Sequence, residues 1–346
     1  MTYKPTSFDI AQRAGVSQPT VSRALRGHPS VSEATRKRIE AIAAQLNYAV
    51  DQNASRLRSG TTRTLALLFF EESAPEDGQI NPFFLSMLGA ISRACSRQGY
   101  DLLASFQELS RNWHVDYEDS HKADGIMLLG YGDYEAYRDK LALLEREGTH
   151  YVRWGAVNAE NPDGTIGCDN RLGGQLAARH LLDRGYRRIA FLGDASSRAP
   201  EIEERYRGAC DAMRANGVTP DPALCVSAET NEASGYSAAQ QLLERDMDFD
   251  AVFAACDLIA VGAMRAFEEA GLSIPHDLGI VGFDDIPIAA LTSPPLTTIS
   301  QDPAHAGTML VETLIAKIRG EAPPAMMLTP HLILRHSTQA PITVLD

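Results

Sequence analysis

From residue 64 onward, short apolar runs alternate with segments of helical periodicity, and this alternation constrains the fold more than any other feature of the chain. Helices that connect strands in this order cover both faces of a parallel sheet, so the pattern predicts α/β folding with doubly wound parallel sheets. The predicted strands are residues 64–70, 100–105, 125–129, 150–154, 188–192, 251–254, 279–283 and 332–335.

The strand–helix series restarts near the middle of the chain, which predicts two similar subdomains. Ligands in open α/β sheets bind at the carboxyl ends of the strands, so we expect a ligand cleft between the subdomains. The predicted helices are 83–99 and 134–147 in the first series and 170–184, 201–215, 234–245 and 258–270 in the second.

Residues 8–25 predict a helix-turn-helix. The first helix is expected to end near Ala14, Gly15 supplies the turn, and Ser17 caps the second helix by accepting a backbone N–H. The second helix is apolar on one side and polar on the other, where it carries Gln18, Thr20 and Arg23. A helix of this kind has the geometry that reads base edges in a major groove. A third helix is predicted from Ser32 to about Leu46.

The charge is distributed very unevenly. The whole chain carries a formal net charge of -13, which by itself argues against nucleic acid. Residues 1–63, however, hold ten Lys and Arg against four Asp and Glu. A basic head on an acidic body concentrates the attraction to phosphates in one small module. The alternative, a basic tail without specificity, lacks the helical periodicity and caps that this segment has.

Several classes of protein are disfavoured by the sequence. The sequence has no run of about 18 apolar residues, so no membrane span is predicted, and the N-terminus lacks a secretory pattern. The five cysteines include no C-x-x-C, so we expect reduced thiols in a cytoplasmic protein, without a disulfide framework or a zinc site. The sequence contains no H-E-x-x-H, G-x-S-x-G or P-loop signature, so we do not expect an enzyme. We therefore expect no metal and no cofactor.

Three motifs in one order are highly specific. They are Asp9-Ile10-Ala11 through Val21-Ser22-Arg23, then Asn47-Tyr48, then Ile280-Val281-Gly282-Phe283-Asp284-Asp285 followed by Pro295-Leu296-Thr297-Thr298-Ile299. With them the chain resembles the lactose-repressor (LacI/GalR) family over essentially its whole length. The resemblance implies an all-α helix-turn-helix head, a core like a periplasmic sugar-binding protein, and a homodimer that reads a near-palindromic operator.

The domain boundaries expected from these patterns are as follows. The helix-turn-helix head is 1–47, and the linker 48–63 is expected to form a hinge helix, capped by Asp51, that is ordered only when it docks. The first core subdomain is 64–167 with 297–328, and the second is 168–296 with 329–346. No heptad helix follows the last predicted strand, which favours a dimer over a tetramer.

The resemblance also implies residues that contact DNA. In the head they are Thr6, Ser17, Gln18, Pro19, Thr20, Ser22 and Arg23. In the hinge, Ala54 and Leu57 match positions where the leucine wedges into a central minor-groove step. Two hinge positions depart from the family pattern, because Val50 stands where Pro is usual and Asp51 where Asn is common.

For the effector site, Arg205 and Asp284 match family positions that reach a ligand, and together they suit the hydroxyl pairs of a polyol. Asp257 follows Cys256, which stands where many members have Asn. Arg153 and Trp154, after a predicted strand, offer a charge and a stacking surface. Further candidates near the first strand are Phe70, Glu71, Asn81 and Phe84. The alternatives are an interdomain ion pair for Arg205 and Asp284, ordinary core for Trp154, and a solvated loop for Glu71.

These observations favour a ligand-responsive transcriptional regulator, in the first place a repressor. Its expected partners are operator DNA, a second copy of the chain and a small effector, which we expect to be a saccharide or a sugar derivative. A nucleobase or nucleoside is the alternative effector. A solute-binding protein of a transporter is the alternative function with the same core, and no membrane partner is expected.

Overall fold

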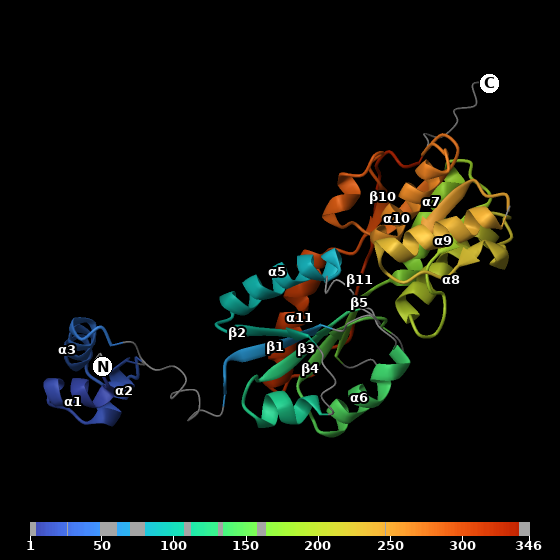
Figure 1. Cartoon of the computed structure of the whole chain (residues 1–346). Coiled ribbons are helices and arrows are strands. Elements are labelled where there is room, and N and C mark those ends of the chain that lie inside the picture. The colour runs from blue at the N-terminus through green and yellow to red at the C-terminus, as the bar shows by residue number, and fades with distance from the viewer. Residues whose placement is uncertain are drawn as a thin grey trace. The chain divides into compact units, whose positions relative to one another are not determined.

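The computed structural model describes residues 5–25, 27–48, 61–69, 80–106, 112–130, 134–157, 164–245 and 247–338. The chain divides into two compact units, Met1–Thr62 and Arg63–Asp346 (Figure 1). The predicted hinge helix, with Asp51, Ala54 and Leu57, lies outside the described residues.

The described residues of the first unit form a three-helix head, as predicted: α1 Ser7–Ala14, α2 Gln18–Leu25 and α3 Glu33–Gln45. Gly15 ends α1 with a φ of 62°, a left-handed conformation that glycine adopts without steric cost. Ser32 caps α3 by accepting the N–H of Thr35. The helices share a small apolar core made by Ile10, Ala11, Ala14, Val21, Ala24, Val31, Ile39 and Ala43.

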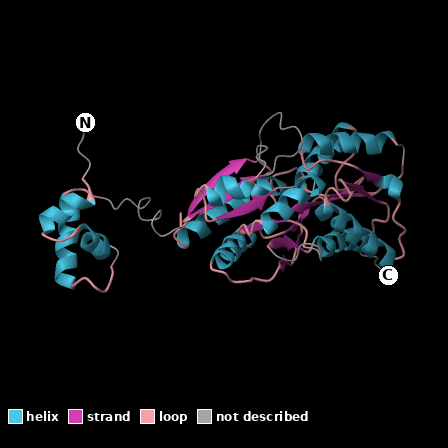
Figure 2. Ribbon diagram, turned by 90° about the horizontal axis from the view of Figure 1, so that it is seen from below, coloured by secondary structure: helices cyan, strands magenta, loops and turns pink. Residues whose placement is uncertain are grey.

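The second unit contains two six-stranded sheets with helices on either side, which confirms the doubly wound architecture (Figure 2). The first sheet has the order β11-β5-β4-β3-β1-β2, and the second has the order β12-β10-β9-β8-β6-β7. Among the strands that the structure describes, all pairings are parallel except that of β12 with β10.

The strands of the first sheet are β1 Thr64–Phe69, β2 Asp101–Phe106, β3 Gly125–Leu129, β4 Tyr151–Trp154, β5 Thr165–Cys168 and β11 Met326–Leu328. Those of the second are β6 Ile189–Leu192, β7 Cys225–Val226, β8 Ala251–Ala254, β9 Gly279–Asp284, β10 Thr297–Ser300 and β12 His331–Ile333. The longer helices are α5 Pro82–Arg97, α6 Tyr134–Arg146, α7 Asn170–Asp183, α8 Pro200–Ala215, α9 Glu232–Glu244, α10 Asp257–Glu269 and α11 Pro303–Ile318. Three short helical turns are η1 Val115–Asp119, η2 Pro222–Leu224 and η3 Pro287–Ala290.

One expected boundary is wrong. Residues 297–328 were assigned to the first subdomain, yet β10 pairs in parallel with β9 of the second sheet. The chain crosses only after β10, where Asp302 caps α11, and α11 packs into the core of the first subdomain through Leu310 and Leu314. The four residues of β10 give no local sign of which sheet they join, because pairing is set by register with a strand that is distant in sequence.

His180 provides a test of the packing of the second subdomain. It lies buried on α7, with Nε2 2.9 Å from the Thr338 hydroxyl. Burial, and then the charge of Arg184, lowers the pKa of His180 from 6.5 to about 4. The unfolded chain therefore takes up a proton at higher pH than the folded chain does. This contribution to stability is complete above pH 6.5 and is lost as the pH falls to about 4, by at most about 3 kcal/mol.

We therefore expect His180→Asn to flatten the pH dependence of stability. In urea unfolding between pH 7 and pH 4, the free energy of unfolding of the native chain should fall more steeply than that of the variant. Parallel profiles for the two proteins would contradict the buried, neutral state of this imidazole.

Candidate functional site

Helix α2 presents an exposed face that is separate from its buried one. Pro19 and Arg23 lie one turn apart and are exposed, and the Nε of Arg23 donates to the Pro19 carbonyl at 3.3 Å. On the opposite side, Val21 and Ala24 are fully buried. The exposed side of α2 can therefore face a ligand without disturbing the core of the head.

Other predicted DNA-contacting residues also hold the head together. The Nε2 of Gln18 donates to the Ser7 hydroxyl at 3.1 Å, which links α2 to α1. The Ser17 hydroxyl lies 2.9 Å from the Thr20 hydroxyl, whereas the expected capping contact was with a backbone N–H. The backbone N–H of Thr6 donates to the Asp9 carboxylate at 2.7 Å. Ser22 is half-buried.

In the core unit, Arg205 on α8 is completely buried. Its Nε donates to Asn170 Oδ1 at 2.8 Å, and its Nη1 donates to the Ala255 carbonyl at 2.6 Å. The guanidinium carbon lies 3.8 Å from the centre of the Phe283 ring, a cation–π arrangement. The guanidinium is thus fixed from three sides at the carboxyl ends of the strands.

Asp284, the last residue of β9, completes this group. It is 1% exposed, and its Oδ1 lies 3.6 Å from Arg205 Nη1 and accepts from Gln301 Nε2 at 2.6 Å. Its φ of 108° is rare for a residue with a side chain. Such a conformation costs about 1–3 kcal/mol and is concentrated at functional sites. We refer to Asn170, Arg205, Asp284 and Gln301 as the polar cluster.

The structure thus brings Arg205 and Asp284 together. The alternative of an ion pair between subdomains does not apply, because α8 and β9 both pack in the core of the second subdomain. Asn170 and Gln301 were not among the residues predicted from the sequence. Each is a polar residue within two positions of the end of a strand, and this is a weak signal that could have identified them.

Asp257, at the start of α10, has different surroundings. It is completely buried; its Oδ2 accepts from the backbone N–H of Ile286 at 2.9 Å and its Oδ1 from the Thr298 hydroxyl at 2.5 Å. Burial, reinforced by the charge of Asp284, raises the pKa of the Asp257 carboxyl well above its usual range. Both carboxylate oxygens therefore bind groups of the chain itself.

The candidates of the first subdomain lie mainly in its core. Trp154 is buried, and the centre of its ring lies 5.9 Å from that of Phe83. Phe84 is also buried, and its ring centre lies 5.3 Å from that of Phe83. Asn81 caps α5 by accepting the N–H of Phe83. The packing of Trp154 agrees with the alternative of ordinary core. Phe70 and Glu71 lie outside the described residues.

Arg153 lies beside a contact that joins the two subdomains. Its Nε donates to the Thr165 hydroxyl at 2.9 Å. Nearby, the backbone N–H of Ala156 donates to Glu201 Oε1 on α8 at 2.8 Å. A Cβ at Gly155 would lie 3.0 Å from that carboxylate oxygen, so glycine leaves room for the contact. Helix α8 therefore contacts the first subdomain through Glu201 and the polar cluster through Arg205, one turn later.

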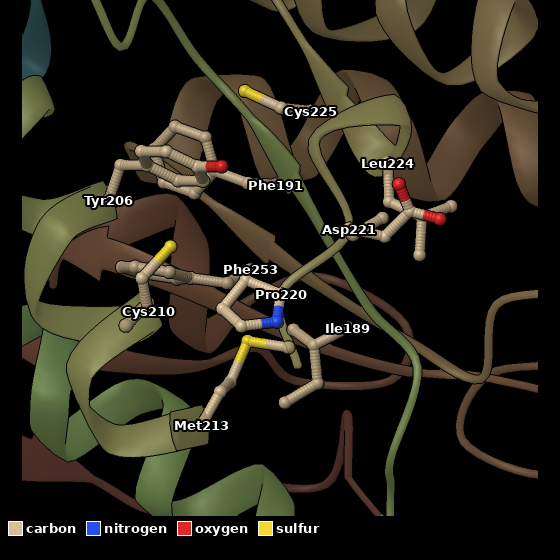
Figure 3. A pocket seen from close by; sticks show the side chains of 12 residues that line it. Ile189, Phe191, Tyr206, Cys210, Met213, Pro220, Asp221, Leu224, Cys225 and Phe253 are labelled. Carbon is tan, nitrogen blue, oxygen red and sulfur yellow. The ribbon is translucent and has the colours of Figure 1, made fainter. Parts of the chain in front are cut away.

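A separate cavity lies between α8 and the β6–β7 edge of the second sheet (Figure 3). Its volume is about 20 Å³, which is room for about one water molecule, and Tyr206, Cys210 and Cys225 line it. Burial raises the pKa of the Cys225 thiol to about 11, so this thiol is protonated at neutral pH. The cavity is too small for a sugar.

Two kinds of feature are absent from the described residues. Among them, no helix has the length and apolar character needed to cross a membrane. Within the same ranges, His, Cys, Asp and Glu side chains form no group of three or more that could hold a metal ion.

Comparison with known proteins gives a consistent result. Residues 8–51 match the family described as bacterial regulatory proteins, lacI family, and residues 178–338 match a periplasmic binding protein-like domain. The chain is 30% identical to the ribose operon repressor of Escherichia coli (strain K12) over 339 residues, which are 96% of this chain and 99% of the relative.

Two solved structures are similar over almost the whole chain. One is the transcriptional regulator CelR–cellobiose complex, with a TM-score of 0.71 and 29% identity, covering 96% of this chain and 100% of that one. The other is the lac repressor dimer bound to operator and the anti-inducer ONPF, with a TM-score of 0.82 and 25% identity, covering 98% and 100%.

Proposed function

Because this chain belongs to the lacI family of bacterial regulatory proteins, we propose that it is a repressor whose operator binding is controlled by a saccharide or sugar derivative. It is a transcriptional regulator by family. The proposal adds that it acts in the cytoplasm as a homodimer on a near-palindromic operator, and that it catalyses no reaction.

The polar cluster is the observation that carries the effector proposal. A buried Arg–Asp pair is expensive to desolvate, so its presence calls for a use other than stability. Arg205, Asp284, Asn170 and Gln301 together offer directional donors and acceptors, which suit the vicinal hydroxyls of a sugar. The similar CelR structure is described as a complex with cellobiose, which supports the same ligand class.

Control of DNA binding requires that the effector changes the relation between the subdomains. Helix α8 carries Arg205, which belongs to the polar cluster, and Glu201, which contacts the segment after β4. A ligand at Arg205 would act on that contact because both residues belong to one rigid helix. A coupling of about 1–3 kcal/mol is enough to change operator occupancy many-fold.

The surface that we assign to the dimer contains β2, an edge strand of the first sheet, and the neighbouring helix α5 (Figure 1). Leu85 on α5 and Leu103 and Phe106 on β2 are 38–45% exposed. An exposed edge strand with apolar side chains is a site for pairing with another chain. A second copy is the occupant that a near-palindromic operator requires, because a two-fold dimer matches two half-sites.

The double variant Leu85→Glu, Leu103→Glu should convert the dimer into a monomer. In a two-fold interface each new carboxylate recurs on the partner, which adds like-charge repulsion of several kcal/mol. Sedimentation velocity of the full chain at micromolar concentration measures the effect. Met327→Glu is the matched control, because Met327 is 55% exposed on β11 at the opposite edge of the sheet. A dimer that persists in the double variant would rule out this surface.

The effector proposal is tested by titrating operator binding with a panel of mono- and disaccharides that includes ribose and cellobiose, with purine bases as the comparison. We expect a saccharide to change the affinity of the chain for its operator at least about fivefold. A response to a purine alone would contradict the sugar assignment and favour the nucleobase alternative.

A further inference from the structure

The turn that follows β9 has an unusual backbone. Asp284 and the next residue, Asp285, both have positive φ, 108° and 54°. Their side chains reach different partners: Asp284 contacts Arg205 and Gln301, whereas Asp285 pairs with Arg335 at 2.6 Å. The position of Asp284 in the polar cluster therefore depends on two consecutive conformations that side chains disfavour.

Asp257 contacts the chain on both sides of this turn. After the turn, its Oδ2 accepts the N–H of Ile286. Its Oδ1 accepts from the Thr298 hydroxyl on the neighbouring strand β10, and Thr298 is the register partner of Gly282, which precedes the turn in β9. A Cβ at Gly282 would lie 2.2 Å from the same Oδ1, so the missing side chain lets the carboxylate approach the strand.

Ile286, which Asp257 holds, connects this turn to the other subdomain. Its side chain is buried in the apolar cluster of the first subdomain, together with Phe83 and Trp154. Just beyond it, η3 carries Ile288, and the following Leu291 is 80% exposed. The turn thus lies between the polar cluster, the core of the first subdomain and an exposed apolar segment.

We propose that Asp257 is the positioning residue for Asp284: it fixes both ends of the strained turn, so that Asp284 stays in the polar cluster and Ile286 stays in the first subdomain. This assigns Asp257 a role other than the direct effector contact that the sequence suggested. The inference rests on the proposed function in so far as Asp284 binds the effector.

A neutral amide should replace this carboxylate well. The Oδ1 of an asparagine can accept the Ile286 N–H while its Nδ2 donates to the Thr298 hydroxyl, so both contacts survive in Asp257→Asn. Burial and the neighbouring Asp284 raise the pKa of the Asp257 carboxyl, which also favours a neutral group here. Alanine supplies neither contact, and Thr298→Val removes only one.

Hydrogen exchange by mass spectrometry on the full chain, without DNA or effector, tests the proposal. In Asp257→Ala we expect the peptide that covers residues 285–291 to exchange about tenfold faster, with a smaller rise in Thr298→Val and none in Asp257→Asn. Peptides from β3 should stay unchanged. Glu268→Ala, which removes an exposed carboxylate from the same helix, should change neither peptide.

Three results would overturn the proposal. Equal acceleration in β3 and in residues 285–291 would make Asp257 a general stability residue, and no acceleration in 285–291 would show that it does not hold the turn. Unchanged exchange in Asp257→Ala, combined with loss of any saccharide effect on operator binding, would indicate direct contact with the ligand. Because exchange is measured without ligand, failure of the sugar assignment is seen separately, in the operator titration.

Discussion

Replacing Arg23 with alanine is expected to remove specific operator binding. Arg23 is exposed on α2, next to Pro19 and away from the buried Val21, so its truncation should leave the head folded. A bidentate contact from arginine to guanine contributes about 1–3 kcal/mol of discrimination. A dimer would therefore lose roughly 2–6 kcal/mol over two half-sites, which brings operator affinity close to that for unrelated DNA.

Fluorescence anisotropy with the operator and a scrambled duplex, at one salt concentration, measures this difference. Arg13→Ala is the matched control, because it removes the same charge from an exposed position at the end of α1. It should weaken binding to both duplexes equally. If Arg23→Ala also weakened both duplexes equally, Arg23 would contact phosphates and not bases.

The largest effect on the core is expected from Arg205→Ala. This change leaves the Asp284 carboxylate buried without its cation and removes the hydrogen bonds to Asn170 and Ala255. Breaking a buried ion pair from one side costs about 3–5 kcal/mol, a large part of the stability of an ordinary domain. We therefore expect a much lower urea midpoint by circular dichroism, together with loss of any saccharide response.

Arg207→Ala on the same helix is the control for this prediction. Arg207 is half exposed and pairs with Glu203 and Glu204, and surface pairs of this kind contribute about 0–1 kcal/mol. Arg205→Lys provides a variant that keeps the charge but not the planar set of donors. It should be more stable than Arg205→Ala and still unresponsive to saccharide. A saccharide response retained in both Arg205 variants would exclude Arg205 from the effector site.

The local elements of the fold could be predicted because their signals lie within a few residues. Gly15 makes the predicted turn of the helix-turn-helix, and the third helix begins at Ser32 as expected, whereas the hydroxyl of Ser17, the predicted cap of the second helix, lies beside the Thr20 hydroxyl. The buried strands β3 and β8 were visible as continuous apolar runs. The strands β5, β7, β10 and β11 were missed. The strands β7 and β11 have only two and three residues, and the Thr, Gly and Ser residues in β5 and β10 interrupt any apolar run.

The site was predictable only in part, for a different reason. Arg205 and Asp284 came from the family resemblance, and the structure brings them together. Asn170 and Gln301 are single polar residues, and their meeting with that pair depends on how α7 and β10 join the second sheet. The role of Asp257 could not be predicted for a similar reason, because its hydrogen-bond partners Ile286 and Thr298 are 29 and 41 residues away in sequence.

The central claim, that a saccharide controls operator binding, is tested most directly on DNA that the protein itself selects. The purified chain is incubated with sheared genomic DNA from its own source, the retained fragments are sequenced, and binding to the recovered site is titrated with and without each sugar of the panel. The account predicts a near-palindromic site and a saccharide that changes its affinity in the native chain but not in Arg205→Ala. No enriched site, with or without the sugars, would contradict it.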